Sequence, residues 1–273
     1  MTPESLFSLH GKTALVTGGA TGIGRMAAEG LVRAGARVLI ASRKGDACKA
    51  VAAQLNALDA PGSAEGFAAD LGSEAGIDAL VAEVKNRSET LDILMNNSGA
   101  TWGAPLGQFP YDAWEKVMNV NVTAMFHLTQ SLLPMLIASG SLDDPSRVVN
   151  VGSVMGEVPM GDGAYSYAVS KGAVLHMTKI LAKELAGQAI TVNALAPGPF
   201  VSRMTAFATA DEDVREQVGK DVPVGRVGRD EDIAGCMLFL CGRGGAYVTG
   251  AVIPVSGGIN VMTSPNIFEK ATS

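Results

Sequence analysis

The sequence predicts an α/β protein built on a doubly wound parallel sheet. Short apolar runs alternate with helix-length segments along the chain, and a glycine-rich turn follows the first apolar run directly. Parallel strands are buried on both faces, so they appear as nearly continuous apolar runs, and a helix usually connects one to the next. We therefore expect one sheet of about seven strands with helices on both of its faces.

Length and composition indicate a single globular domain. The chain has 273 residues, of which 47% are hydrophobic and 18% are charged, and it contains 33 glycines. An α/β fold of this size commonly forms one domain, and the high apolar content argues against disorder. We expect one domain over residues 1–273, with a core at about 11–260.

The strands and helices follow from the apolar periodicity. Strands are expected at residues 13–16, 37–40, 91–95, 147–151, 190–194 and 251–255, with a weaker one at 65–69. Helices are expected at residues 22–34, 44–58, 74–87, 111–138, 165–186 and 229–242. Two stretches interrupt the alternation: we expect residues 139–146 to form an exposed loop and residues 198–228 to form a lid over the substrate site.

Charge and residue spacing exclude several functional classes. The net charge of -6 gives no basic surface for nucleic acid or anionic lipid. The three cysteines have no CxxC spacing and the three histidines have no ligand spacing, so no metal site is expected. The N-terminus lacks the pattern of a signal peptide, and no apolar run approaches the ~20 residues that span a bilayer. We expect a cytoplasmic protein without a membrane partner.

The glycine-rich turn contains Gly18, Gly22 and Gly24, directly after the first strand and at the start of a helix. Glycine lets the main chain approach a pyrophosphate, and a helix N-terminus attracts negative charge. The spacing is T-G-x-x-x-G-x-G, and the alternative is a tight turn that binds nothing. We expect a Rossmann-type dinucleotide site here, with Thr21 and Ile23 among its contacts.

Ser42 and Arg43 follow the second strand, where an acidic residue is expected if the cofactor is NAD. A carboxylate would repel a 2′-phosphate, whereas a guanidinium binds one through two parallel hydrogen bonds and a serine hydroxyl can donate another. We therefore expect NADP(H). The alternative is that Arg43 is an ordinary solvated charge.

Tyr167 and Lys171 lie four residues apart in an expected helix and so share one of its faces. A free phenol ionises near pH ~10, and a nearby ammonium lowers the pKa of the phenol towards neutrality. We expect Tyr167 to exchange a proton with a carbonyl or alcohol oxygen. The alternative is a chance pair, because roughly 0.15 such pairs are expected in a chain of this composition.

From Gly11 to about Asn260, these motifs resemble the short-chain dehydrogenase/reductase family. The resemblance implies that Tyr167 is the proton donor, that Ser153 holds the substrate carbonyl, and that Lys171 binds the nicotinamide ribose. It also implies that Asn121 positions a water that relays protons. The further cofactor contacts that it implies are Asp70, Leu71, Asn97, Ser98, Gly99, Tyr167, Lys171, Pro197, Gly198, Phe200 and Ser202.

Structural roles are open alternatives for some of these residues. Ser153 ends a strand and can cap a turn, Asn121 can satisfy main-chain groups, and Ser98 can be a loop hydroxyl. Tyr165 lies six residues before Lys171 and so off the face of Tyr167, which makes it a pocket wall or a packing residue.

A closer resemblance, to the branch of this family that reduces 3-oxoacyl groups in rhamnolipid synthesis, rests on segments such as Ala100–Ala104 and Gly245–Gly250. It implies a thioester substrate on coenzyme A or acyl carrier protein, and the family implies a homotetramer. The alternatives are a reductase of free ketones, secondary alcohols, steroids or sugars, and a nucleotide-binding regulator without turnover. The expected apolar pocket residues are Trp102, Met155, Met160, Met204 and Phe207.

Overall fold

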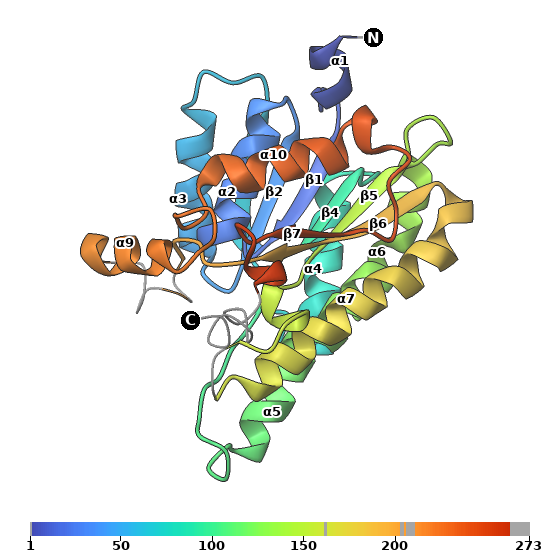
Figure 1. Cartoon of the computed structure of the whole chain (residues 1–273). Helices are drawn as coiled ribbons and strands as arrows, with labels where there is room; N and C mark the ends of the chain where they lie inside the picture. Colours follow the sequence, from blue (N-terminus) through green and yellow to red (C-terminus); the bar gives the residue numbers. More distant parts are fainter. Residues whose placement is uncertain (1, 161–162, 203–204, 206–210, 263–273) are drawn as a thin grey trace.

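All seven strands lie in one parallel sheet, in the order β3-β2-β1-β4-β5-β6-β7. Figure 1 shows it in a computed structural model, which describes residues 2–160, 163–202, 205 and 211–262. The strands are β1 (Thr13–Thr17), β2 (Arg37–Ser42), β3 (Ser63–Ala68), β4 (Ile93–Asn96), β5 (Ser146–Val151), β6 (Ile190–Pro197) and β7 (Val252–Val255). The predicted Rossmann-type fold is confirmed.

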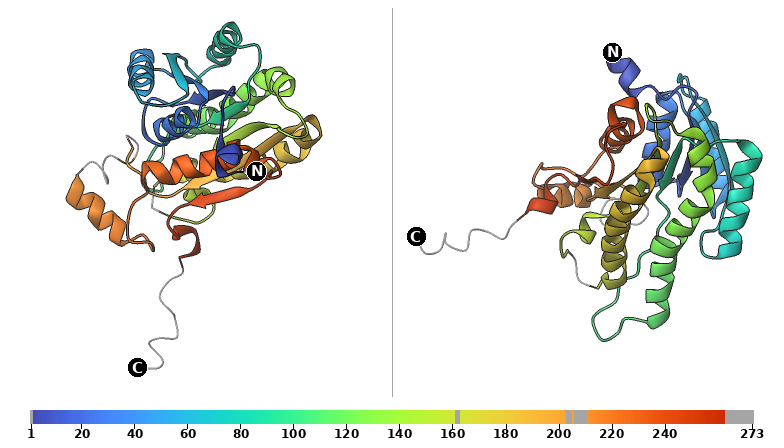
Figure 2. Two further views of the ribbon diagram at one scale, coloured as in Figure 1. Left: turned by 90° about the horizontal axis from the view of Figure 1, so that it is seen from above. Right: turned by 90° about the vertical axis from the view of Figure 1, so that its right-hand side faces the viewer.

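Helices cover both faces of the sheet (Figure 2). One face packs against α2 (Gly22–Arg33), α3 (Gly45–Asn56) and α10 (Asp230–Cys241). The other packs against α4 (Glu74–Arg87), α6 (Ala124–Ser139) and α7 (Tyr165–Leu185). Successive residues of a strand point to opposite faces of the sheet. Val16 therefore packs in the core beneath α2, α3 and α10, and Leu15 packs in the core beneath α4, α6 and α7.

The structure corrects four details of the predicted elements. The helix expected at 111–138 consists of α5 (Tyr111–Met118), a π-helical turn (Asn119–Thr123) and α6. The stretch expected to form a lid contains the helix α9 (Glu212–Lys220), and α1 (Pro3–Phe7) was not expected. Strand β7 is an edge strand with only partial burial, and its exposed Pro254 fits an edge position because proline cannot donate to a neighbouring strand.

The run from Tyr111 to Ser139 is long and apolar enough, by length and composition, to cross a membrane, with a mean hydropathy of 1.3. Polar residues divide it into shorter apolar stretches, so no continuous apolar run in the sequence reaches the length that spans a bilayer. Its apolar residues Leu128, Leu132 and Leu136 are fully buried against the sheet and α4. It is therefore a core helix of the fold.

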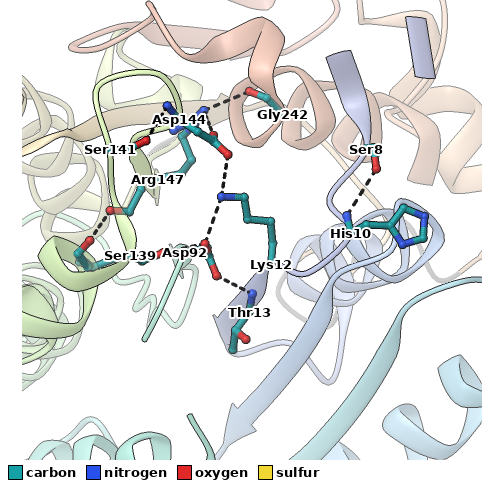
Figure 3. Close-up of polar contacts among 12 residues, drawn as sticks. Ser8, His10, Lys12, Thr13, Asp92, Ser139, Ser141, Asp144, Arg147 and Gly242 are labelled. Carbon is teal, nitrogen blue, oxygen red and sulfur yellow. Dashed lines mark hydrogen bonds and ion pairs between the residues drawn. The ribbon is translucent and has the colours of Figure 1, made fainter. Parts of the chain in front are cut away.

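A charged network joins the amino-terminal ends of β1, β4 and β5 (Figure 3). Lys12 pairs with Asp92 at 3.1 Å and with Asp144 at 2.7 Å. Arg147, which is 2% exposed, contacts Asp144 and donates to the carbonyl oxygens of Leu240 and Gly242. It therefore caps the C-terminal end of α10 and fixes that helix on the sheet.

Candidate active site

The glycine-rich turn lies at the carboxyl end of β1, beside the point where the strand order reverses between β1 and β4. In such folds this crevice is where ligands bind. The turn is braced from the next strand: Asn97 Nδ2 donates to Thr17 O at 2.8 Å and to Gly18 O at 3.2 Å. Thr17 Oγ1 in turn accepts the main-chain N–H groups of Asn97 and Ser98. The predicted cofactor residue Asn97 thus shapes the turn with its side chain.

Gly18, Gly22 and Gly24 of the turn have no room for a side chain. A Cβ on Gly24 would lie 2.4 Å from Asn97 Nδ2, and a Cβ on Gly22, whose φ is +53°, would lie 2.8 Å from Ser202 Cβ. Gly18 also has a positive φ, of +66°, a conformation that favours glycine. The turn therefore needs glycine at these positions. Ser202 lies against the turn at Gly22, and its contact with the cofactor stays a prediction.

The N-terminus of α2 fits a pyrophosphate. Its N-cap residue Thr21 is exposed and makes no capping hydrogen bond with its side chain. The first N–H groups of a helix have no partner within the helix, and with the helix dipole they favour an anion. These main-chain groups, from Gly22 to Gly24, are the ones that would hold the cofactor's phosphates.

The end of β2 offers groups for a third phosphate. Ser42 Oγ accepts the main-chain N–H of Lys44 at 3.3 Å, and the Arg43 side chain is exposed. Lys44 is the N-cap of α3 and also makes no side-chain capping bond. A serine hydroxyl, two cations and a helix N-terminus therefore lie together, and the nearest acidic residue in the sequence is the exposed Asp46 in the first turn of α3. The residues present fit a 2′-phosphate.

Ser153, Tyr167 and Lys171 meet at the carboxyl end of β5. Ser153 is 7% exposed, and its Oγ accepts the N–H of Met155 at 3.2 Å, which confirms its capping role. The same hydroxyl is hydrogen-bonded to Tyr167. Lys171 is 5% exposed, and its Nζ donates to the carbonyl oxygen of Val151 at 2.7 Å. The two elements β5 and α7 thus bring these groups together.

The predicted direction of the Tyr167 pKa is wrong for this state of the protein. Desolvation raises the pKa of Tyr167 above its ordinary value, while a hydrogen bond with Ser153 lowers it by less. Burial also lowers the pKa of Lys171 to about 8. The ammonium is itself destabilised by burial and hydrogen-bonds to Val151 O, so it does not offset the desolvation of the phenol.

Asn121 lies in the π-helical turn between α5 and α6 and is 2% exposed. Its amide donates to Ala100 O and to Ser170 Oγ, both at 2.9 Å, and its Oδ1 accepts Ala100 N–H at 2.7 Å. A Cβ on Gly99 would lie 3.4 Å from Asn121 Oδ1 and 3.7 Å from Lys171 Nζ. The structure therefore brings Asn121 and Lys171 to one small space above Gly99, and the water relay stays a prediction.

Comparison with known proteins identifies the family. A family profile described as enoyl-(acyl carrier protein) reductase matches residues 18–260, a span that includes the glycine-rich turn and all four predicted catalytic residues. The chain belongs to the short-chain dehydrogenase/reductase family.

Individual members of this family resemble the chain closely. The rhamnolipids biosynthesis 3-oxoacyl-[acyl-carrier-protein] reductase of Pseudomonas aeruginosa is 48% identical over 255 residues, covering 93% of this chain and 98% of that protein. The structure of the Pseudomonas aeruginosa RhlG/NADP active-site complex has a TM-score of 0.89 at 47% identity and covers 95% of this chain and 100% of that one. Gluconate 5-dehydrogenase of Gluconobacter oxydans is 34% identical over 261 residues, which make up 96% of this chain and 99% of that protein.

Other predicted cofactor residues of this short-chain dehydrogenase/reductase lie around the same edge of the sheet. Asp70 is exposed after β3, and its Oδ1 accepts Gly72 N–H at 3.0 Å, while Leu71 is buried. Pro197 ends β6, and Gly198 packs against Ser256. The Phe200 side chain is 2% exposed and packs against Gly228, so its ring belongs to the core. A cofactor contact at Phe200 stays a prediction for its main chain.

The predicted substrate pocket is described only in part. Trp102 is 44% exposed, Met155 is half-buried, and Met160 packs against a small cluster that includes Val154 and Val222. Met204 and Phe207 lie outside the described residues. A hollow of about 860 Å³ lies elsewhere, between α2, α9 and α10, and charged residues of both signs line it.

Sequence reasoning missed two supporting residues in this short-chain dehydrogenase/reductase. Ser170 Oγ accepts from Asn121 and donates to Tyr167 O at 2.7 Å, which links the two predicted catalytic positions. Phe109 makes an edge contact with Tyr165, with the ring centroids 5.8 Å apart, which confirms a packing role for Tyr165. The three-residue spacing of Ser170 and Tyr167 along α7 was the one signal in the sequence for Ser170. Nothing in the sequence indicated the contact of Phe109 with Tyr165.

Proposed function

We propose that this chain is an NADPH-dependent carbonyl reductase that converts 3-oxoacyl thioesters into 3-hydroxyacyl thioesters. The observation that supports this most is the meeting of Ser153, Tyr167 and Lys171 beside a glycine-rich turn that fits a dinucleotide. Reduction of a ketone builds negative charge on its oxygen, and two hydroxyl donors at one place stabilise that charge.

Each residue has a distinct task in this proposal. Bound NADPH supplies the hydride, and the protein orients the substrate towards it. Tyr167 donates its phenolic proton to the carbonyl oxygen, and its raised pKa keeps the phenol protonated at neutral pH, as a general acid requires. Ser153 donates its hydroxyl hydrogen to the same oxygen. Lys171, held by Val151 O, orients the cofactor ribose, and Asn121 orders the water that returns a proton.

NADP(H) is favoured by the end of β2, where Ser42, Arg43 and Lys44 stand in place of an acidic residue. The solved relative named as an NADP complex is 47% identical over nearly the whole chain, which supports the same cofactor here.

The thioester substrate is supported by the relative named a 3-oxoacyl-[acyl-carrier-protein] reductase, at 48% identity. Exposed Trp102 and half-buried Met155 and Met160 offer flexible apolar contacts that suit an acyl chain. A second candidate, oxidation or reduction of a free sugar acid, is favoured by the 34% identity with a gluconate 5-dehydrogenase.

A substrate panel separates the two. The purified protein is mixed with NADPH and acetoacetyl-CoA, acetoacetyl-acyl carrier protein, a keto-gluconate or simple ketones, and loss of nicotinamide absorbance is followed. We expect the highest kcat/KM with an acetoacetyl thioester. A higher kcat/KM with the keto-gluconate would support the second candidate, and tight NADPH binding without oxidation by any carbonyl would overturn both.

We also propose that the chain assembles as a homotetramer through α5, α6 and α7. Apolar side chains are exposed on these helices, among them Phe126 at 42%, Val169 at 51% and Ile180 at 51%. Packing of these helices between subunits would remove these side chains from water. Light scattering after size-exclusion chromatography tests this, and a monomeric mass would contradict it.

A further inference from the structure

Cys48 is a buried cysteine for which the proposed chemistry has no role. It lies on α3 at 0% exposure, and its Sγ is 3.0 Å from Ser42 Oγ. Ser42 ends β2 and is the hydroxyl that we expect to meet the cofactor's 2′-phosphate. Cys48 is therefore in direct contact with a proposed phosphate ligand while being shielded from solvent itself.

The position of Cys48 is fixed by close main-chain packing. A Cβ on Gly66 of β3 would lie 2.2 Å from the carbonyl carbon and oxygen of Cys48, so the helix presses directly on this strand. At the start of α3, a Cβ on Gly45 would lie 2.9 Å from the Cβ of Ala68, which is the strand neighbour of Ser42. The main chain of Cys48 is therefore held at a fixed distance from β3 and from the end of β2.

The hydrogen bonds of Ser42 explain what a thiol at this place can do. A serine hydroxyl has one hydrogen to donate and two lone pairs that accept. Ser42 Oγ already accepts the N–H of Lys44 at 3.3 Å. If the thiol of Cys48 donates to the second lone pair, the serine hydrogen is left to donate to another acceptor, such as a phosphate bound near Arg43 and the start of α3. A phosphate accepts hydrogen bonds but does not donate when ionised, and so requires a donor there.

We propose that Cys48 is a positioning residue for the 2′-phosphate: its thiol donates to Ser42 Oγ, turns the serine hydroxyl outward, and so increases the preference for NADP(H) over NAD(H). This inference depends on the cofactor part of the proposed function and not on the substrate. Either atom can donate in the contact between Ser42 Oγ and Cys48 Sγ, and a bound phosphate would select the arrangement in which the thiol donates and the serine hydroxyl points outward.

The test is direct binding to the protein without cofactor, measured by calorimetry with 2′,5′-ADP and with 5′-AMP. The variants are Cys48→Ala and Cys48→Val, which lack the donor, and Cys48→Ser, which keeps one. Cys236→Ala on α10 is the matched control. We expect both donorless variants to bind 2′,5′-ADP roughly 5-fold more weakly, as for one lost hydrogen bond, with 5′-AMP unchanged and Cys48→Ser restoring most of the affinity.

A double-mutant cycle separates positioning from simple packing. In a Ser42→Ala background, Cys48→Ala should cause no further loss of 2′,5′-ADP affinity, because its effect passes through Ser42. An equal loss for both nucleotides, no loss in either donorless variant, or the full loss in the Ser42→Ala background would each overturn the inference. If the wild-type protein binds 2′,5′-ADP no better than 5′-AMP, the proposed cofactor is wrong instead. The steady-state KM values for NADPH and NADH provide a second readout. In the donorless Cys48 variants, the KM for NADPH should rise and the KM for NADH should stay unchanged.

Discussion

Lys171 Nζ lies 5.5 Å from the centre of the Tyr167 ring, while the same nitrogen donates to Val151 O at 2.7 Å. The ammonium is thus anchored to β5, the strand that leads into Ser153, and faces the ring that bears the reactive phenol. This places the two groups on one face of α7, at the spacing that the sequence predicted. Burial of the phenol, and not the charge of Lys171, sets the direction of the Tyr167 pKa shift.

Replacing Tyr167 with Phe should remove the proton donor and preserve the fold. We expect NADPH binding to be retained and kcat to fall by roughly 10²-fold or more, the lower range for general acid–base catalysis. Tyr165→Phe is the control, because it keeps the ring that contacts Phe109. Calorimetry and steady-state kinetics measure both effects. If the two variants lose activity equally, Tyr167 has no special role.

The lowered pKa of Lys171 should make the stability of the folded protein depend on pH. Its folded pKa of about 8 lies below the ordinary value of 10.5. Between these values the unfolded chain binds a proton that the folded chain does not, so the free energy of unfolding rises with pH in this window. From about pH 7 to about pH 9.5, we expect the wild type to gain roughly 2 kcal/mol relative to Lys171→Met, which has no such group.

Urea denaturation of both proteins at the two pH values measures this difference. Tyr167 and every other ionisable group are present in both, so the difference reports the lysine. A constant or shrinking gap would show that the folded pKa of Lys171 is not lowered.

Arg43 sets the charge at the end of β2. Changing Arg43 to Asp should repel a 2′-phosphate and accept the ribose hydroxyls of NADH. We expect kcat/KM for NADPH to fall by roughly 10²-fold, with that for NADH unchanged or higher, since two charge-assisted hydrogen bonds are lost. Lys49→Asp, an exposed cation further along α3, is the control. An unchanged NADPH:NADH preference would contradict the assignment.

Gly22 tests the shape of the cofactor turn. A Cβ there would lie 2.8 Å from Ser202 Cβ, and the residue has a φ of +53°. Gly22→Ala should therefore weaken cofactor binding and destabilise the fold by roughly 1–2 kcal/mol. Gly235→Ala on α10 is the opposite case, since nothing lies within 4 Å of its added Cβ. It should stabilise the helix by up to about 1 kcal/mol without affecting binding, as thermal melts with and without NADP would show.

Arg147 tests the network at the amino-terminal edge of the sheet. Arg147→Met would leave the carbonyl oxygens of Leu240 and Gly242 without their donor and remove one partner of Asp144. We expect a loss of about 3 kcal/mol in unfolding free energy, while the exposed control Arg243→Met should cost less than about 0.5 kcal/mol. Equal effects in chemical denaturation would show that the network contributes nothing specific.

Much of the fold was predictable because each buried parallel strand leaves a short apolar run, and all seven runs that were recognised became strands. The least regular parts were not. The π-helical turn around Asn121 follows from its bonds with Ala100 and Ser170, which come from distant segments. The helix α9 is mostly exposed and strongly polar, and its only two apolar residues, Val214 and Val218, lie four positions apart, which is too short a pattern to stand out within a long polar stretch.

The site was predictable as a set of residues but not as an electrostatic environment. Spacing alone placed Lys171 beside Tyr167, yet the sign of the Tyr167 pKa shift depends on how deeply the phenol is buried, which spacing does not reveal. The contact of Cys48 with Ser42 likewise depends on how α3 packs on β3, where Gly66 admits the helix main chain.

The central claim is that Tyr167 protonates a ketone that NADPH reduces. The most direct measurement incubates the wild-type protein and Tyr167→Phe with NADPH and an acetoacetyl thioester, and follows both NADPH loss and formation of the 3-hydroxyacyl product. The account predicts equal molar amounts of NADPH consumed and 3-hydroxyacyl thioester formed by the wild type, and a rate reduced by roughly 10²-fold or more in the variant. No product from the wild type, or equal rates in both proteins, would contradict it.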